Sequence, residues 1–156
     1  MSKRISISEK PINVVKAVRL MFLCLVIGLI NSFFVFFTSI PEEAEHLVNA
    51  AKLPTGVATV TIYSALILII IIFLVNLFFI AKLSQGRNWA RIVYLILFVV
   101  GISDIVTKNI PTFNSINDVI MVIILIVQVV ALFLIFSKSS NDWYAMLKAE
   151  RRVKKN

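Results

Sequence analysis

The stretch VATVTIYSALILIIIIFLVNLFFIA, from Val57 to Ala81, decides the fold, because it carries neither a charge nor a proline. The polar segment KLSQGRNWAR (residues 82–91) follows it, and a second apolar run then extends from Ile92 to Ser103. About 20 apolar residues, each with a rise of about 1.5 Å, cross the hydrocarbon core of a bilayer as a helix. The stretch therefore predicts a hairpin of two membrane-spanning helices whose turn lies on one face of the membrane.

The composition of the whole chain is typical of a membrane protein. Of its 156 residues 60% are hydrophobic and 15% are charged, and the mean hydropathy is +0.96. The net charge of +8 suggests nucleic-acid binding at first sight. However, the basic residues lie at the ends of the apolar runs and in both tails, which is the pattern of membrane topology. We therefore expect the lipid bilayer, and no nucleic acid, as a partner.

Four apolar runs predict an all-α polytopic membrane protein, with four transmembrane helices in an up-down bundle. The spans are expected at about residues 20–40, 57–81, 89–106 and 116–136. The predicted organisation is a basic N-terminal segment (1–19), the transmembrane domain (20–137) and a basic tail (138–156).

Prolines and capping residues predict where the helices begin and end. Pro11 suits a first helical turn, and Pro41 is expected to end the first helix. Residues 41–54 are then an outer loop with a short surface helix. The sequence Ser-Ile-Asn-Asp at residues 115–118 is a capping box for the fourth span.

The tail is predicted to form a last helix, capped by residues 139–142 and running from Trp143 to about Lys155. One face is apolar and the other is basic, so the helix is expected to lie on anionic lipid headgroups at the cytoplasmic surface. The alternative is a frayed basic tail that only enforces topology.

The distribution of Lys and Arg predicts the orientation, because these residues are retained on the cytoplasmic side. Fourteen of the 16 lie in the N-terminal segment, the 82–91 turn and the tail, and only Lys52 and Lys108 lie in the other loops. Both termini and the central turn are therefore predicted to be cytoplasmic. Four spans, an even number, also require both termini to lie on the same side of the membrane. We expect a multi-pass protein of the plasma (inner) membrane.

Polar residues inside predicted spans are candidates for function. Asn31, Asp104 and Gln128 each lie roughly 15 to 20 Å along a helix axis from a basic residue at the inner end of their span. The functional interpretation is an intramembrane cluster that holds a proton or a small ligand. The alternative is that the amides form interhelical hydrogen bonds that fix packing, while Asp104 extends to the outer interface.

Catalytic, cofactor and metal sites are not expected. The chain has one cysteine, Cys24, and one histidine, His46, so neither a disulfide within the chain nor a thiol-redox pair can form. The three glutamates beside His46, at positions 42, 43 and 45, are interpreted as a solvated loop, since the zinc motif needs two histidines four residues apart.

Trp89, Arg91 and Trp143 are predicted to anchor the chain at the membrane interface, where tryptophan and basic residues are enriched. Gly86 and Asn88 are expected to permit the reversal of the chain between the second and third spans.

The segment Gly-Arg-Asn-Trp-Ala-Arg at residues 86–91, which leads into Ile92-Val93, resembles the inner turn of a large group of small bacterial membrane proteins that are uncharacterised. These proteins have four spans and often end in a segment similar to Ser-Lys-Ser-Ser-Asn-Asp-Trp-Tyr, which stands here at residues 137–144. The resemblance covers the second half of the chain. It implies a bacterial inner-membrane protein and no particular activity.

The sequence favours a non-enzymatic accessory, scaffold or immunity-type protein that acts through helix–helix contacts with another membrane protein or with further copies of itself. The alternative is a small channel or transporter that uses Asp104 as its intramembrane ionisable group. A membrane enzyme is the third reading, and no nucleophile–base or metal constellation supports it.

Overall fold

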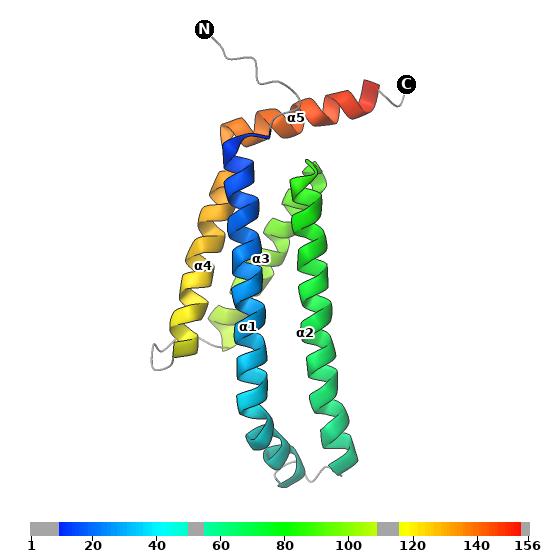
Figure 1. Cartoon of the computed structure of the whole chain (residues 1–156), viewed down its shortest axis with the longest axis vertical. Coiled ribbons are helices and arrows are strands. Elements are labelled where there is room, and N and C mark those ends of the chain that lie inside the picture. The colour runs from blue at the N-terminus through cyan, green and yellow to red at the C-terminus, as the bar shows by residue number, and fades with distance from the viewer. Residues whose placement is uncertain (1–9, 50–54, 109–115, 154–156) are drawn as a thin grey trace. The chain divides into compact units, whose positions relative to one another are not determined.

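The computed structural model describes residues 10–49, 55–108 and 116–153, and these residues form five α-helices and no strand (Figure 1). The helices are α1 (Ile12–Asn49), α2 (Thr55–Ser84), α3 (Asn88–Lys108), α4 (Ile116–Ile135) and α5 (Lys138–Val153). The prediction of an all-α protein is confirmed.

Three stretches of helix are long and apolar enough to cross a membrane, namely Ile12–Thr38, Thr59–Ser84 and Ile116–Ile135. They overlap with the first, second and fourth predicted spans, at residues 20–40, 57–81 and 116–136, and they indicate a membrane protein. The predicted third span lies on α3, whose apolar part within the described residues, Asn88–Ser103, is shorter.

The first helix does not end at Pro41, as the sequence analysis expected, but continues to Asn49. A proline inside a helix removes one hydrogen bond. The glutamates, alanine and leucine that follow it favour helix strongly enough to offset that loss. Thr38 donates its hydroxyl to the carbonyls of Phe34 and Val35, an arrangement that often bends helices, and the ribbon of α1 bends towards its C-terminal end (Figure 1). The side chains of residues 39–49 lie outside the description, so the interpretation of the acidic cluster stays a prediction.

The last helix begins at Lys138, five residues before the predicted start at Trp143. Ser137 precedes it, and the Ser137 carbonyl accepts the N–H of Asn141 at 2.9 Å, which closes the first helical turn. The Ser137 hydroxyl lies 3.0 Å from that of Ser140. Residues 139–142 therefore lie inside the first turn instead of ahead of it.

Two other helix starts agree with the sequence. The carbonyl of Pro11 accepts the N–H groups of Val14 and Val15, at 3.0 and 3.2 Å, so α1 starts directly after this proline. Helix α4 begins at Ile116, as predicted, while Ser115 of its capping box lies outside the described residues.

The chain forms two compact units. Unit 1 comprises Met1–Cys24 with Phe78–Asn156, and unit 2 comprises Leu25–Leu77. Every buried side chain in the described part of the molecule belongs to unit 1. There Val14, Ala17, Met21 and Cys24 occupy one face of α1, at helical spacing, and the Cys24 thiol lies 3.9 Å from the Ile124 carbonyl on α4.

In unit 2 several described polar side chains bond to their own helices. Thr61 donates to the carbonyl of Val57, Ser64 to that of Thr61 and Asn76 to that of Ile72. The large apolar side chains that are described in this unit are exposed or half-buried, as suits a segment in contact with lipid or with another helix.

Candidate functional site

A tight turn at residues 85–87 joins α2 to α3, and we call residues 82–91, which comprise this turn and the adjoining helix ends, the Gly86 turn. Gly86 has a φ of 70°, in the left-handed region that glycine adopts without strain. The N–H of Gly86 donates to the Leu83 carbonyl at 3.0 Å, and that of Arg87 to the Lys82 carbonyl at 3.1 Å. This pair of bonds is the Schellman motif that ends many helices, and it explains why glycine stands at this position.

Helix α5 packs directly against the Gly86 turn. Trp143 is only 3% exposed, and a Cβ atom at position 86 would lie 3.1 and 3.2 Å from two atoms of its indole ring and would overlap the Leu147 side chain. The turn therefore needs glycine for two reasons, its backbone conformation and the close approach of α5.

Arg91 lies at the centre of this contact, with 8% of its surface exposed. Its Nη1 atom donates to Oδ1 of Asn141 at 2.7 Å and to the Ile135 carbonyl at 3.3 Å, and Nη2 donates to Oδ1 of Asn88. The guanidinium carbon also lies 4.1 Å from the centroid of the Tyr144 ring, where a cation is attracted to the ring electrons. Amide oxygens and an aromatic face thus surround this buried cation. None of its described contacts is with a carboxylate.

Tyr144 and Arg151 complete the contact, which we call the turn–α5 junction. The Tyr144 hydroxyl donates to the Leu83 carbonyl at 2.8 Å, and Arg151 donates to the carbonyls of Gln85 and Gly86 at 2.7 and 3.0 Å. Leu83 lies in the last turn of α2, and Gln85 and Gly86 directly follow the helix, where carbonyls accept no N–H from a further helical turn. Burial raises the pKa of Tyr144 to about 12, although the nearby charge of Arg91 lowers it in part. Tyr144 is therefore a neutral donor at ordinary pH.

Further bonds join the start of α1 to this end of unit 1. Asn13 donates to the hydroxyls of Ser137 and Ser139, at 3.1 and 3.0 Å, and Lys10 donates to the hydroxyl of Ser84 at 3.0 Å. The beginning of α1, the end of α2 and the start of α5 are therefore tied together by side chains that are far apart in the sequence.

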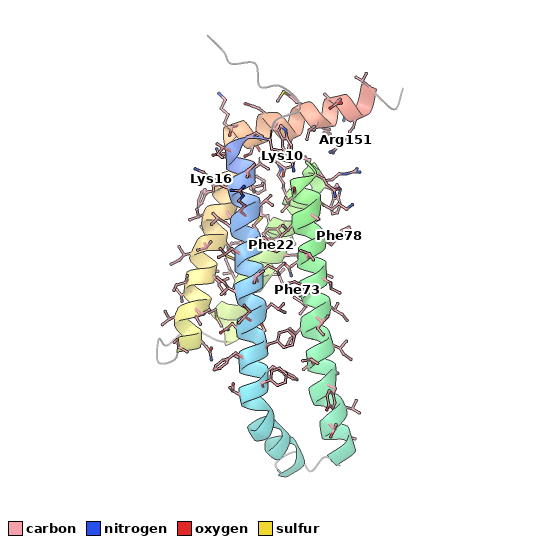
Figure 2. The ribbon with its side chains drawn as sticks, in the orientation of Figure 1. Lys10, Lys16, Phe22, Phe73, Phe78 and Arg151 are labelled. Atoms are coloured by element: carbon pink, nitrogen blue, oxygen red, sulfur yellow. The ribbon has the colours of Figure 1, made fainter. Side chains whose placement is uncertain are left out.

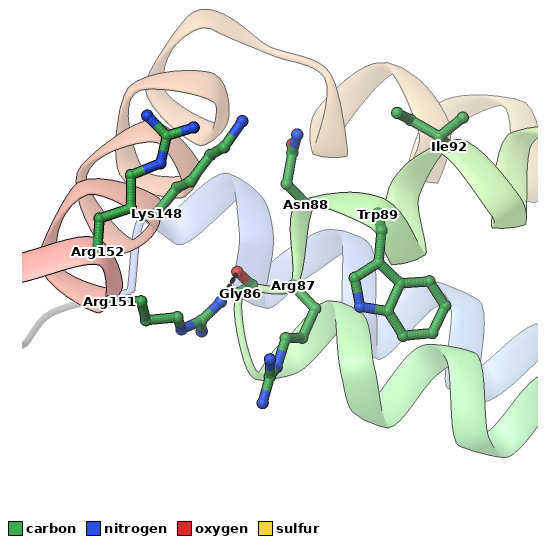
Figure 3. Close-up of a pocket in the computed structure, with 8 residues that line it drawn as sticks. All are labelled: Gly86, Arg87, Asn88, Trp89, Ile92, Lys148, Arg151 and Arg152. Carbon is green, nitrogen blue, oxygen red and sulfur yellow. Dashed lines mark hydrogen bonds between the residues drawn. The ribbon is translucent and has the colours of Figure 1, made fainter. Parts of the chain in front are cut away.

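A pocket of about 420 Å³ lies beside the junction (Figure 3). It is lined by Gly86, Arg87, Asn88, Trp89, Ile92, Lys148, Arg151 and Arg152. Four of these eight residues are cationic.

The arrangement at the junction provides binding and positioning. An arginine stays protonated in proteins, and a phenol with a raised pKa stays neutral, so neither group accepts a proton at ordinary pH. In the part of the chain that the structure describes, no group of three or more His, Cys, Asp or Glu side chains lies close enough to hold a metal ion.

The three predicted interface anchors all lie in this region, in different surroundings. Trp89 is 45% exposed and makes an edge-to-face contact with Phe79, with 6.0 Å between ring centroids. Arg91 and Trp143 are buried against protein instead. The anchoring role stays a prediction for all three, and the structure adds a packing role for the two buried residues.

The predicted intramembrane cluster also stays a prediction. Gln128 is half-buried on α4 of unit 1, and Asn31 is half-buried on α1 in unit 2. Asp104 lies on α3, and its side chain is outside the description.

Sequence reasoning missed Asn141, Tyr144 and Arg151 as partners of the turn. Helical spacing places these three residues on one face of the last helix, and this shared face is the signal that could have identified them. The sequence analysis instead assigned Arg151 to the basic face of this helix, which was expected to lie on anionic lipid headgroups.

No protein-family model, curated protein or solved structure matches this chain. The similarity to bacterial inner-membrane proteins stays a prediction. The two segments that carry it, residues 86–91 and 137–144, are the ones that meet at the junction through the bond from Arg91 to Asn141.

Proposed function

We propose that this chain is a non-enzymatic integral membrane protein with four spans and cytoplasmic termini, which acts as an accessory, scaffold or immunity-type protein through helix–helix contacts. The observation that carries the proposal is the turn–α5 junction. Its donors are used to hold one helix against a turn, as in a protein whose role is to present surfaces to others.

The arrangement of unit 1 supports the proposed topology. The start of α1, the end of α2, the start of α3 and the end of α4 all lie near α5 (Figure 1), as an up-down order of four helices requires. Lys10, Lys16 and Arg151 lie at this same end, whereas Phe22 on α1 and Phe78 on α2 lie farther from it (Figure 2). Basic residues at one end favour its placement on the cytoplasmic side of a membrane.

The apolar surfaces of unit 2 support action through helix contacts. On α2 the exposed side chains of Val60, Ile67 and Leu74 are seven residues apart and so lie along one stripe. Such a stripe suits packing against a helix of another protein or of a second copy, in addition to lipid.

Two measurements in membranes test the proposal. Cytoplasmic reporters fused after Gln85 and after Asn156 should be active, and a reporter fused after Ala50 should not. Photoreactive residues at positions 60, 67 and 74 should yield adducts with protein. An outward Asn156 contradicts the topology, and adducts with lipid alone at all three positions contradict the helix-contact function.

A further inference from the structure

The pocket beside the junction is suited to an anion. Arg87, Lys148, Arg151 and Arg152 line it, and none of its lining residues in the described part of the chain is acidic (Figure 3). Arg151 is held in place by the two carbonyls of the Gly86 turn, while Arg87, Lys148 and Arg152 are exposed. Several cations around one concave site attract a group that carries more than one anionic oxygen, such as a phosphate.

The start of α3 adds to this positive field. Helix α3 begins at Asn88, and both Asn88 and Trp89 line the pocket. The first N–H groups of a helix have no partner within the helix and carry partial positive charge. Four cationic side chains and the start of one helix thus all contribute positive charge to the pocket.

The opposite wall of the pocket is apolar. Binding of a free anion would not need an apolar wall, whereas a ligand that joins an anionic group to an apolar part would use it. The side chains of Trp89 and Ile92 are 45% and 52% exposed. Leu95 follows Ile92 by three residues and is its neighbour on the surface of α3. Leu95 also lines a second, apolar pocket of about 310 Å³ between α3 and α4, together with Phe98, Val129, Leu132, Phe133 and Phe136. One lining residue of the basic pocket, Ile92, is therefore a neighbour on α3 of one lining residue of the apolar pocket, Leu95.

We infer that unit 1 carries a site for one anionic glycerophospholipid. Its phosphate lies among Arg87, Lys148 and Arg152, with Arg151 as the fixed side of the cradle. One acyl chain follows Ile92 and Leu95 into the apolar pocket. The inference rests on the proposed topology, which puts this end of the protein at the cytoplasmic leaflet, where anionic lipids gather.

This site differs from the adsorption of a basic helix on a charged surface. Adsorption needs only the net charge of α5 and any anionic lipid nearby. The inferred site also needs Arg87, which belongs to the Gly86 turn and not to α5. It predicts one tightly held lipid for each chain.

The test is native mass spectrometry of the full-length protein, released from a neutral detergent and titrated with phosphatidylglycerol or phosphatidylcholine. We expect one phosphatidylglycerol adduct to saturate first, with a preference of about tenfold over phosphatidylcholine. A variant with Arg87, Lys148 and Arg152 all changed to Gln should lose about tenfold in affinity, since each cation near an anionic lipid contributes up to about a factor of five.

The matched control changes Lys16, Arg19 and Lys138 to Gln. It removes the same charge from exposed positions outside the pocket lining. It should change the affinity less than about twofold. Equal losses in the two variants would show diffuse adsorption and overturn the inference, as would the absence of any preference in the unchanged protein.

Two further arms separate the remaining explanations. Inorganic phosphate added in excess should leave the lipid adduct in place, because it has no chain to fill the apolar pocket, and full displacement would identify a site for a free anion. Binding in detergent does not depend on orientation. If the protein shows no preferred lipid adduct but the reporter fusions behave as expected, this inference alone is overturned. If lipid binding is as expected but the reporter places Asn156 outside, the proposed function alone is overturned.

Discussion

The two units of this protein use polar side chains in opposite ways. In unit 2 Thr61, Ser64 and Asn76 donate to carbonyls three or four residues earlier in the same helix. In unit 1 Arg91 donates to Asn141 and Tyr144 to Leu83, across 50 and 61 residues of sequence. Unit 1 also contains all the buried side chains of the described part of the chain.

The difference shows where the sequence specifies one arrangement. A hydroxyl or amide that bonds its own helix is satisfied in any surroundings, including hydrocarbon, and so selects no partner. A donor that reaches another element is satisfied only when that element is in place. The position of α5 on the Gly86 turn is therefore specified by polar contacts, whereas the faces of unit 2 remain available to lipid or to other helices.

The largest expected effect is that of Arg91→Leu, which should release α5 from the Gly86 turn. The substitution leaves Asn141, Asn88 and the Ile135 carbonyl without their donor, and we expect a loss of about 3 kcal/mol. The readout is the emission of Trp143 in a Trp89→Phe background, in which Trp143 is the one remaining tryptophan. Its emission should shift to the red as water reaches the ring.

The control for this prediction is Arg19→Leu, which removes an exposed cation from α1 and should leave the emission unchanged. Unchanged emission in Arg91→Leu itself would mean that apolar packing alone holds α5.

Gly86→Ala should have the next largest effect, a loss of about 2 kcal/mol. The left-handed backbone disfavours a side chain by about 1 to 2 kcal/mol, and the new methyl group would overlap Leu147. Thermal unfolding in detergent measures the loss. A companion Leu147→Ala change should restore the part that comes from overlap.

Gly101→Ala is the matched control, because no heavy atom lies within 4 Å of its added Cβ. It should raise the unfolding midpoint slightly, since alanine favours helix over glycine by about 1 kcal/mol. Equal midpoints for the Gly86 and Gly101 variants would contradict the close approach of α5 to the turn.

Tyr144→Phe should lower the free energy of unfolding by about 1 kcal/mol, because it removes the bond to the Leu83 carbonyl and keeps the ring against Arg91. Thermal unfolding in detergent measures this loss.

The hydroxyl of Tyr144 also leads to a prediction about pH. Burial raises the pKa of Tyr144 to about 12, above its ordinary value of about 10. The neutral phenol therefore stabilises the docked helix at all pH values below about 10, and this stabilisation is lost as the pH rises from about 10 to about 12.

Trp143 emission followed across this pH range should shift in the unchanged protein and stay level in Tyr144→Phe. An identical shift in both proteins would assign the transition to another group.

The smallest effects are expected in unit 2. Thr61→Val and Asn76→Leu should each change the stability by less than about 0.5 kcal/mol, because each lost bond was made to a carbonyl of the same helix. Thermal unfolding in detergent again gives the comparison. A loss as large as that of Tyr144→Phe would reveal a polar contact of unit 2 with another element, and the contrast between the units would fail.

Features that depend on neighbouring residues were predictable from the sequence. The long apolar runs indicated the three helices that suit a membrane, Pro11 and Ile116 marked the starts of α1 and α4, and Gly86 marked the turn. Pro41 misled the prediction, because the helix expected within residues 41–54 was separated from the first helix at this proline, whereas α1 continues through it to Asn49.

The junction could not be predicted in the same way. Arg91 directly precedes the apolar run that starts at Ile92, and arginine at such a position usually reaches the lipid headgroups, so its position in the sequence assigned it to the interface. Its acceptors, on Ile135 and Asn141, lie 44 and 50 residues away. Only the path of α4 and α5 brings them together, and a single sequence gives no pairwise signal for such contacts.

The separation of these partners along the chain also sets the order in which the protein matures. Arg91, Leu83 and Gly86 find their partners 50, 61 and 65 residues later. At a synthesis rate of about 5 to 20 residues per second, the ribosome needs roughly 3 to 13 s to supply them. During that interval the Arg91 guanidinium and the carbonyls of Leu83 and Gly86 lack the partners that cover them in the complete fold. A chain whose synthesis stops between Arg91 and Asn141 thus lacks every one of these α5 partners, and the surface that the complete chain conceals at the Gly86 turn has no cover.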